Sequence, residues 1–203
     1  MYKIIKRILD FLISLFAIIV LLPVLAITSI AVKTDSKGPV FFVQKRVGKD
    51  KKHFNMYKFR SMRTDTPHDM PTHLLNNPDV FITKVGKFLR KSSLDELPQL
   101  FNILKGDMSI VGPRPALWNQ ADLIAERDKY SANDIRPGLT GWAQVNGRDE
   151  LEIDVKAKYD GEYVKKMSLM FDIKCIIDTA LQVLKHEGVV EGGTGTLEKS
   201  NKE

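Results

Sequence analysis

The longest apolar segment of the chain lies near its N-terminus. The 22 residues from Phe11 to Val32 include no Asp, Glu, Lys, Arg or His, and most are Leu, Ile, Val, Phe or Ala. As one straight α-helix they would extend roughly 33 Å, about the thickness of the hydrocarbon core of a bilayer. The pattern predicts a membrane anchor.

A proline interrupts this segment near its middle. Pro23 removes one backbone hydrogen bond and therefore bends or breaks a helix. Lysines and arginines flank the segment on both sides, and such residues favour the cytoplasmic side of a membrane. A helix that enters the bilayer, turns at Pro23 and returns places both flanks on that side, with Ser14, Thr28 and Ser29 available to the backbone groups that the turn frees. We expect a re-entrant hairpin over residues 1–33. A single span is the alternative, and a signal peptide is disfavoured because no small-x-small cleavage site follows.

The rest of the chain has the pattern of a compact domain. Val40–Val43 and Phe54–Phe59 predict two paired strands, with a turn at residues 48–50. Apolar residues recur at helical spacing in four segments, which are residues 80–89, 94–104, 151–166 and 169–185. The last of these has one apolar side, which suits either a buried core or an interfacial helix on a bilayer.

Two segments lack such periodicity. Residues 64–78 contain three prolines and predict a loop. Residues 112–147 are rich in Gly, Pro and polar residues and are too long for a simple connection. Trp118 and Trp142 argue against disorder there, so we expect this segment to serve a function. Residues 188–203 are polar and predict a mobile tail.

Charge and cysteine content narrow the classes of function. The chain has 31 Lys and Arg against 25 Asp and Glu, a net charge of +6, which predicts an anionic partner such as a phosphate, a nucleic acid or an acidic membrane face. The lone cysteine, Cys175, excludes an intramolecular disulfide and a multi-cysteine zinc site. P-loop, dinucleotide-binding, His-Glu-x-x-His and Gly-x-Ser-x-Gly motifs are absent from the sequence. The basic residues also lack the aromatic interleaving of a nucleic-acid module.

Two adjacent carboxylates stand out in the Ser93–Gln99 segment. Ser93 and Glu96 have the spacing of a capping box, and acidic residues suit the first turn of a helix. Pro98 keeps Asp95 and Glu96 at the helix N-terminus, where exposed backbone N–H groups also attract phosphate. The pair therefore serves either as a helix cap or in catalysis.

The neighbouring arginines favour a phosphate site. Arg90 precedes the pair and Arg114 follows it, so that carboxylates for a divalent metal and guanidinium forks for a diphosphate lie close in sequence. An aspartate can also attack phosphorus directly and form an aspartyl phosphate. Arg136 and Arg148 flank a glycine-rich segment that suits either close approach to a ligand or a set of structural turns. For any one of these residues a surface salt bridge is the alternative.

Together these segments resemble a known family. The motifs are Lys6-Arg7-x-x-Asp10 before the apolar segment, Tyr57–Met62, Ser93–Gln99, Lys105–Ser109, Val111–Pro115 and Arg136–Arg148. In this order they are similar to the bacterial sugar transferases, and more specifically to the small monotopic phosphoglycosyl transferases. The resemblance runs from about Lys6 to Leu184.

The resemblance implies a fold and a location. We expect a mostly helical α+β protein: a re-entrant membrane hairpin over residues 1–33, a catalytic domain over residues 34–187 with amphipathic interfacial helices and a short β-hairpin, and the tail. It also implies a bacterial cell membrane, with the catalytic domain on the cytoplasmic face against inner-membrane lipid. Oligomer formation remains open, and no nucleic-acid partner is expected.

The resemblance also implies a reaction. A sugar 1-phosphate moves from a UDP-sugar to undecaprenyl phosphate through a covalent intermediate on Asp95, and UMP is released; this is the first membrane step of capsule, exopolysaccharide or glycan assembly. Asp95 and Glu96 would be the catalytic residues and the ligands of Mg²⁺. The implied substrate-binding residues are Arg90, Arg114, Arg136, Arg148, Lys58 and Arg60. Asp172, at the start of the last helix, has either a family role or a capping role.

A different class of function is compatible with the composition. A membrane-tethered module could bind anionic lipid or nucleotide through its basic surface without turnover. Such a module has no need for the Asp95-Glu96 pair, whereas here arginines, glycines and paired acids are concentrated in one half of the domain. The transferase therefore accounts for more of the sequence.

Overall fold

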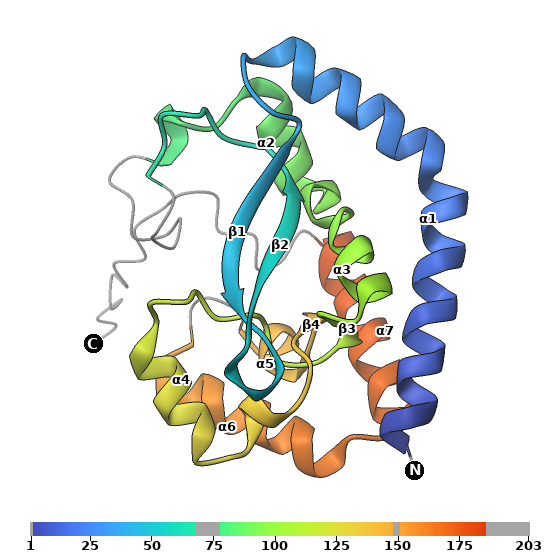
Figure 1. Cartoon of the computed structure of the whole chain (residues 1–203), viewed down its shortest axis with the longest axis vertical. Coiled ribbons are helices and arrows are strands. Elements are labelled where there is room, and N and C mark those ends of the chain that lie inside the picture. Colours follow the sequence, from blue (N-terminus) through green and yellow to red (C-terminus); the bar gives the residue numbers. More distant parts are fainter. Residues whose placement is uncertain (1, 68–77, 148–150, 186–203) are drawn as a thin grey trace, which may run out of the picture.

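The N-terminal segment folds as one helix, α1 (Tyr2–Asp35), in the computed structural model, which describes residues 2–67, 78–147 and 151–185. Figure 1 shows α1 running along one side of the molecule and curving over its top. The expected break into a hairpin at Pro23 is not present, because the helix continues through the proline and curves instead. Loss of a single N–H donor leaves the neighbouring backbone hydrogen bonds in place, so a long helix can absorb it as a bend. The helix ends two residues beyond the expected boundary at residue 33.

The outward face of α1 is apolar and its inward face is partly polar. Within the described part of the chain, α1 is the only helix long and apolar enough to cross a membrane. Lys6, Asp10, Ser14 and Thr28 are buried against the domain, whereas most of the large apolar residues are exposed. Such a surface requires an apolar environment.

The predicted strand pair is confirmed and is longer than the pattern indicated. β1 (Phe41–Val47) and β2 (His53–Phe59) are antiparallel, with Phe41 opposite Phe59 and Val47 opposite His53. The turn between them contains a short 3-10 turn, η1 (Lys49–Lys51), in which Asp50 has a left-handed backbone conformation. Asp tolerates that conformation better than most residues, which fits the turn.

Helices surround this hairpin and a second small sheet (Figure 1). The helices that follow are α2 (Lys84–Lys91), α3 (Gln99–Lys105), α4 (Ala121–Asp128), α5 (Trp142–Val145), α6 (Ile153–Lys166) and α7 (Leu169–Lys185). Three more short 3-10 turns are η3 (Pro78–Val80), η4 (Leu94–Glu96) and η5 (Ala132–Asp134). The second sheet pairs β3 (Ser109–Val111) in parallel with β4 (Gly138–Thr140). The prediction of a mostly helical α+β protein is confirmed.

The aperiodic segment 112–147 is ordered and contains two helices and a strand. α4, β4 and α5 all lie within it, and we had predicted none of them. Their short lengths leave too few apolar repeats for periodicity to be visible in the sequence. Of the loop predicted over residues 64–78, residues 68–77 lie outside the described residues, as does the tail at 188–203.

The core joins α1 to the domain. Ile103 of α3 and Met108 are fully buried, and Ala17, Ile18 and Leu21 from the middle of α1 pack against their cluster. The apolar N-terminal helix and the domain therefore share one hydrophobic core.

A buried arginine caps the C-terminal end of α1. Arg60 is 5% exposed, and its guanidinium donates to the carbonyls of Pro39 and Lys37, each at 2.7 Å, and of Ser36 at 2.8 Å. A longer contact reaches the carbonyl of Val32 at 3.4 Å. Cations at a helix C-terminus stabilise the unsatisfied carbonyls of the last turn. This residue fixes the end of α1 to the end of β2.

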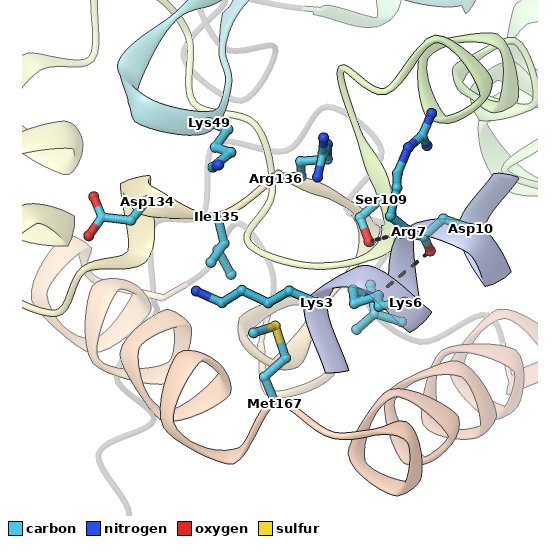
Figure 2. A pocket seen from close by; sticks show the side chains of 11 residues that line it. Lys3, Lys6, Arg7, Asp10, Lys49, Ser109, Asp134, Ile135, Arg136 and Met167 are labelled. Atoms are coloured by element: carbon cyan, nitrogen blue, oxygen red, sulfur yellow. Dashed lines mark hydrogen bonds and ion pairs between the residues drawn. The ribbon is translucent and has the colours of Figure 1, made fainter. Parts of the chain in front are cut away.

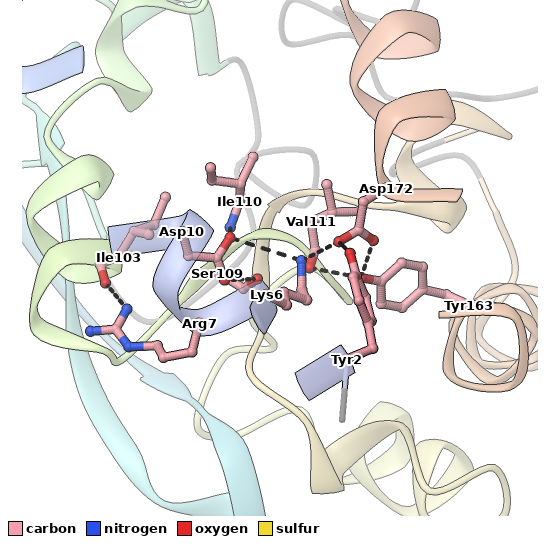
Figure 3. A network of polar contacts seen from close by, with 10 residues as sticks. All are labelled: Tyr2, Lys6, Arg7, Asp10, Ile103, Ser109, Ile110, Val111, Tyr163 and Asp172. Carbon is pink, nitrogen blue, oxygen red and sulfur yellow. Dashed lines mark hydrogen bonds and ion pairs between the residues drawn. The ribbon is translucent and has the colours of Figure 1, made fainter. Parts of the chain in front are cut away.

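The N-terminal end of α1 is fixed to α7 (Figure 3). Asp172 forms an ion pair with Lys6 at 2.6 Å and accepts hydrogen bonds from the hydroxyls of Tyr2 at 2.5 Å and Tyr163 at 2.6 Å. The capping interpretation of Asp172 is not confirmed, since Ser168 caps the first turn of α7 by accepting from the backbone N–H of Phe171. Asp172 instead joins α1, α6 and α7.

Two further polar residues of α1 hold it to β3 and α3. Asp10 accepts from the hydroxyl of Ser109 at 2.7 Å and from the backbone N–H of Ile110 at 3.1 Å. Arg7 donates to the carbonyls of Ile103 and Leu104, at the C-terminal end of α3. The Lys6-Arg7-x-x-Asp10 motif is thus a docking motif within the fold.

A close backbone contact positions α2, and it gives a testable prediction. A Cβ atom added at Gly86 would lie 1.9 Å from the carbonyl oxygen of Ser61, so the two segments must separate. We expect Gly86→Ala to lower the free energy of unfolding by about 2–3 kcal/mol, on the scale of overpacking in a core. Lys84→Ala in the same helix, at an exposed position, should change it by less than about 0.5 kcal/mol. Thermal melting of both variants measures the difference, and equal melting temperatures would contradict the contact.

Candidate active site

The Asp95-Glu96 pair lies on η4, between α2 and α3. Ser93 precedes it with a left-handed backbone (φ 56°) and makes no side-chain capping hydrogen bond. The predicted capping box is therefore wrong, because its serine does not have the extended backbone of an N-cap residue and its glutamate is bound elsewhere. The left-handed turn and the 3-10 geometry instead direct the two carboxylates to different neighbours.

Glu96 is held by two cations. Its Oε1 atom accepts from Nζ of Lys58 on β2 at 2.8 Å and from the guanidinium of Arg114 at 3.3 Å. The side chains of Lys58 and Glu96 are each only 16% exposed, so the ion pair is partly shielded from water. The Glu96 carboxylate of η4 thus joins β2 to the Pro113-Arg114-Pro115 segment.

Asp95 is buried and, among the described residues, accepts no hydrogen bond. Burial raises the pKa of its carboxyl group, and the nearby Glu96 carboxylate raises it further, while Lys58, Arg90 and Arg114 oppose the shift. A carboxylate that is 7% exposed and accepts no hydrogen bond from the described residues is costly for a fold to maintain. Such a residue is typical of a functional site.

Arg90 lies at the end of α2 with an unused donor. Its Nε atom is buried and has no hydrogen-bond partner in the described part of the chain. The positive charge of its side chain is close enough to Asp95 to act on the pKa of that carboxyl. An unsatisfied guanidinium beside a buried carboxylate suits binding of an anionic ligand.

Two arginines that the sequence analysis did not single out hold the Arg114 segment. Arg127 of α4 donates to the carbonyl of Arg114 at 2.9 Å, and Arg46 of β1 donates to the carbonyl of Pro115 at 3.0 Å. Arg127 is itself paired with Asp160 of α6 at 2.6 Å, and both side chains are almost fully buried. The signal that could have found Arg127 is a charged residue at the inward position of an amphipathic helix, whereas Arg46 lies on strand β1, where the sequence gives no such signal.

Comparison with known proteins identifies the family to which this arrangement belongs. Residues 1–186 match the family described as bacterial sugar transferase. The chain belongs to the bacterial sugar transferase family. The resemblance expected from the motifs is therefore confirmed.

Two relatives of this chain have names that specify a reaction. A UDP-glucose:undecaprenyl-phosphate glucose-1-phosphate transferase of Xanthomonas campestris pv. campestris is 42% identical over 186 residues, which are 88% of this chain and 38% of that protein. A UDP-N-acetylgalactosamine-undecaprenyl-phosphate N-acetylgalactosaminephosphotransferase of Aeromonas hydrophila is 38% identical over 188 residues, which are 90% of this chain and 44% of that protein.

A third relative is similar in length. The uncharacterized sugar transferase EpsL of Bacillus subtilis (strain 168) is 38% identical over 196 residues, which are 97% of this chain and 95% of that protein. This bacterial sugar transferase therefore spans less than half the length of the first two relatives and nearly all of the third.

The structure brings together half of the predicted substrate-binding residues of this sugar transferase. Lys58, Arg90 and Arg114 surround the Asp95-Glu96 pair. Arg60 is instead bound to backbone carbonyls at the end of α1, and Arg136 donates from Nε to the carbonyl of Gly106 at 2.8 Å. Arg148 lies outside the described residues. Sequence proximity to glycines did not distinguish arginines that bind backbone from those that face the carboxylates.

The carboxylate pair of this family member fits a magnesium ion that is also bound by substrate. No cluster of three or more His, Cys, Asp or Glu side chains that could hold a metal occurs in the described residues. Mg²⁺ often takes only one or two carboxylates together with substrate phosphates, so Asp95 and Glu96 suffice. Within the part of the chain that the structure describes, the Asp95 carboxylate accepts no hydrogen bond, whereas Glu96 shares its oxygen with Lys58 and Arg114. Asp95 is therefore the better ligand of the two.

The cysteine of this chain does not have the properties of a nucleophile. Burial in the α7 core raises the pKa of the Cys175 thiol to about 11, with the Asp172 carboxylate adding to the shift. The thiol is therefore neutral at physiological pH, and a neutral buried thiol is unreactive.

Proposed function

We propose that this chain transfers a sugar 1-phosphate from a UDP-sugar to undecaprenyl phosphate. The observation that carries the proposal is the buried Asp95 carboxylate, which has no hydrogen-bond donor in the described residues and is surrounded by Lys58, Arg90 and Arg114. The relatives named for this reaction support the substrates. We place the reaction at the first membrane step of capsule, exopolysaccharide or glycan assembly.

In the first step, a carboxylate oxygen of Asp95 attacks the phosphorus that carries the sugar. An oxygen–phosphorus bond forms on Asp95 as the bond from that phosphorus to the bridging oxygen breaks, and UMP leaves with the electron pair. A carboxylate free of hydrogen bonds keeps its lone pairs available for this attack. Arg90 and Arg114 would bind the diphosphate oxygens and stabilise the charge that develops on them.

In the second step, a phosphate oxygen of undecaprenyl phosphate attacks the same phosphorus. The bond to Asp95 breaks, which regenerates the carboxylate and yields undecaprenyl-diphospho-sugar. Both steps place a phosphate group against the same arginines, so one site can serve a soluble and a lipid-borne substrate in turn. Glu96 positions Lys58 and Arg114 through its ion pairs.

Asp95 and Glu96 are the residues that would hold Mg²⁺. When bound, the ion would neutralise charge on the diphosphate and make its phosphorus more susceptible to attack. Lys58 already balances the charge of Glu96, so the additional positive charge is needed mainly at Asp95 and the substrate.

The packing of α1 favours a re-entrant placement, and the lysines and arginines that flank its apolar segment favour the cytoplasmic face for the active site. The N-terminal end of α1 is bound through Lys6 to Asp172, and its C-terminal end is bound through Arg60, so one domain holds both ends. The middle of α1 also packs on α3. A helix crossing the bilayer would carry one end away from the domain, whereas a curved helix inserted in one leaflet keeps both ends on the same side. The exposed apolar residues of α7, such as Met170 and Ile177, would rest on the same membrane surface.

Intact mass spectrometry of the full chain tests this function. The protein in neutral detergent is incubated with Mg²⁺ and UDP-glucose, UDP-galactose or UDP-N-acetylgalactosamine in the absence of acceptor. We expect a mass gain of one sugar phosphate with one donor, release of UMP, and loss of the adduct when undecaprenyl phosphate is added. Glu96→Gln should reduce the rate by about tenfold or more, because Lys58 and Arg114 lose the negative charge of their shared partner.

A negative result in both assays would contradict the proposed reaction. If no donor yields an adduct or UMP with acceptor and Mg²⁺ present, the reaction is not the function of this chain. The alternative of a membrane-tethered lipid-binding module without turnover would then be preferred.

A further inference from the structure

A second basic site lies at the N-terminal end of α1, among residues that do not contact the Asp95-Glu96 pair (Figure 2). A cavity of about 110 Å³ is lined by α1, the turn η1, the segment before β4 and the junction of α6 and α7. Whole drug-sized ligands take roughly 300–1,000 Å³, so this cavity fits a single small group rather than a nucleotide sugar. The sugar-phosphate transfer proposed above does not use this cavity.

Three cations from distant parts of the sequence face this cavity. Lys3 comes from α1, Lys49 from the hairpin turn and Arg136 from the segment before β4. Figure 2 shows the Lys3 and Lys49 side chains approaching Ile135 from opposite sides. Two other basic lining residues, Lys6 and Arg7, are already bound to Asp172 and to the last carbonyls of α3.

The described residues do not neutralise these three cations. Arg136 uses only Nε, on the carbonyl of Gly106, and its two terminal nitrogens have no partner among the described residues. Lys3 has no ion pair there, and Lys49 has only a 3.6 Å contact with Asp50, in which both side chains are about half exposed. An exposed pair of this kind contributes little.

The acids that line the cavity do not balance this charge. Asp10 accepts hydrogen bonds from Ser109 and from the backbone of Ile110, and it faces Lys6 at 3.9 Å. The carboxylate of Asp134 points away from the cavity in Figure 2. The first turn of α1 has no acidic residue, and its exposed backbone N–H groups add positive potential.

The position of the cavity indicates the source of the anion. Met167, just after α6, lines it, and the exposed apolar side chains of Leu169 and Met170 follow at the start of α7. On the other side, Ile4 and Ile8 of α1 are exposed in the same way. A cavity bounded by two apolar surfaces that enter a membrane lies at the depth of the lipid phosphates, and basic pockets at that depth bind anionic headgroups.

We propose that this cavity binds a phosphate group, supplied by the headgroup of an anionic phospholipid. Lys3 and Lys49 hold the phosphate from two sides, and Arg136 links it to the C-terminal end of α3. Binding there fixes the end of α1 that carries the Lys6–Asp172 ion pair and so sets the tilt of the domain on the membrane. Free phosphate has the same chemistry, and the experiment separates the two sources.

The test uses the full chain in a neutral detergent with a charge-matched control. Native mass spectrometry counts lipids bound after addition of phosphatidylglycerol or of phosphatidylcholine. The variant Lys3→Gln/Lys49→Gln is compared with Lys129→Gln/Lys158→Gln, which removes the same charge at exposed positions that do not line the cavity. We expect phosphatidylglycerol to bind about tenfold more weakly to the first variant and unchanged to the second. Phosphatidylcholine should bind weakly to all three proteins.

A second arm adds inorganic phosphate and follows thermal melting. If phosphate stabilises the unmodified protein but not Lys3→Gln/Lys49→Gln, while the two lipids bind alike, the anion site is supported and its source is a soluble phosphate. If neither probe distinguishes the cavity variant from its control, the proposal is overturned. UMP release in neutral detergent is measured in parallel and should be the same for all proteins, so failure of this site is separate from failure of the transferase reaction.

Discussion

Asp95→Asn is expected to abolish both the sugar-phosphate adduct and UMP release, without lowering the melting temperature. The amide has nearly the same size as the carboxylate but cannot attack phosphorus, so we expect a fall in rate of about 10³-fold or more. Because burial raises the pKa of Asp95, its ionised form is unfavourable in the folded protein. Replacing it by a neutral side chain therefore relieves a cost, and the melting temperature should be unchanged or higher.

The combination of the two readouts separates a nucleophile from a structural residue. Intact mass with the donor identified from the panel measures the adduct, and thermal melting in the same detergent measures stability. Asp65→Asn is the matched control, because the Asp65 side chain is 56% exposed and should leave both readouts unchanged. An adduct on Asp95→Asn, or a large drop in melting temperature, would rule out the nucleophile assignment.

Arg127→Met is expected to lower the free energy of unfolding by about 3–5 kcal/mol. The change leaves Asp160, 1% exposed, without its ion-pair partner at 2.6 Å, and an unpaired buried charge is among the most costly defects in a fold. It also removes the donor to the carbonyl of Arg114, so transfer activity should fall because Arg114 loses its position beside Glu96. At this chain length the loss corresponds to roughly 10 °C in melting temperature.

Two companion variants make this prediction specific. Arg127→Met/Asp160→Leu removes both charges and should recover part of the lost stability, while activity stays low because the carbonyl of Arg114 still lacks its donor. Lys174→Gln breaks an exposed pair with Asp178 and should cost less than about 0.5 kcal/mol. If Arg127→Met and Lys174→Gln melt within a degree of each other, the buried pair does not stabilise the fold.

The helices and strands that repeat an apolar pattern were predictable from the sequence. α6 and α7 begin and end within two residues of the predicted segments, and the β1–β2 hairpin lies where alternation and a turn signal placed it. These elements present one apolar face to the core, and a periodic face is a local property. α4, α5 and β4 are too short for a period to be seen, so the sequence pattern did not reveal them.

The site was predictable in part. Asp95 and Glu96 are adjacent and have arginines close by in the sequence, so their neighbourhood drew attention to them, whereas the capping box that was the alternative for the same segment does not form. Arg60, Arg90, Arg114 and Arg136 are alike in sequence, but two of them face the carboxylate pair and two bind backbone carbonyls. Whether an arginine faces the carboxylates or binds backbone depends on where helix ends and free carbonyls lie in the folded protein.

The sequence by itself determined that the chain has a long apolar N-terminal segment, a mostly helical domain and a carboxylate pair among basic residues. Each of these follows from residues close together along the chain. Only the tertiary structure decided that Pro23 bends α1 without breaking it, that both ends of α1 are fixed to one domain, and that Lys58 meets Glu96 across 38 residues. Those outcomes depend on packing and on contacts between residues that are far apart in the sequence. An ion or a carbonyl that is removed from water needs a hydrogen-bond or ion-pair partner, and the fold decides which group is close enough to be that partner.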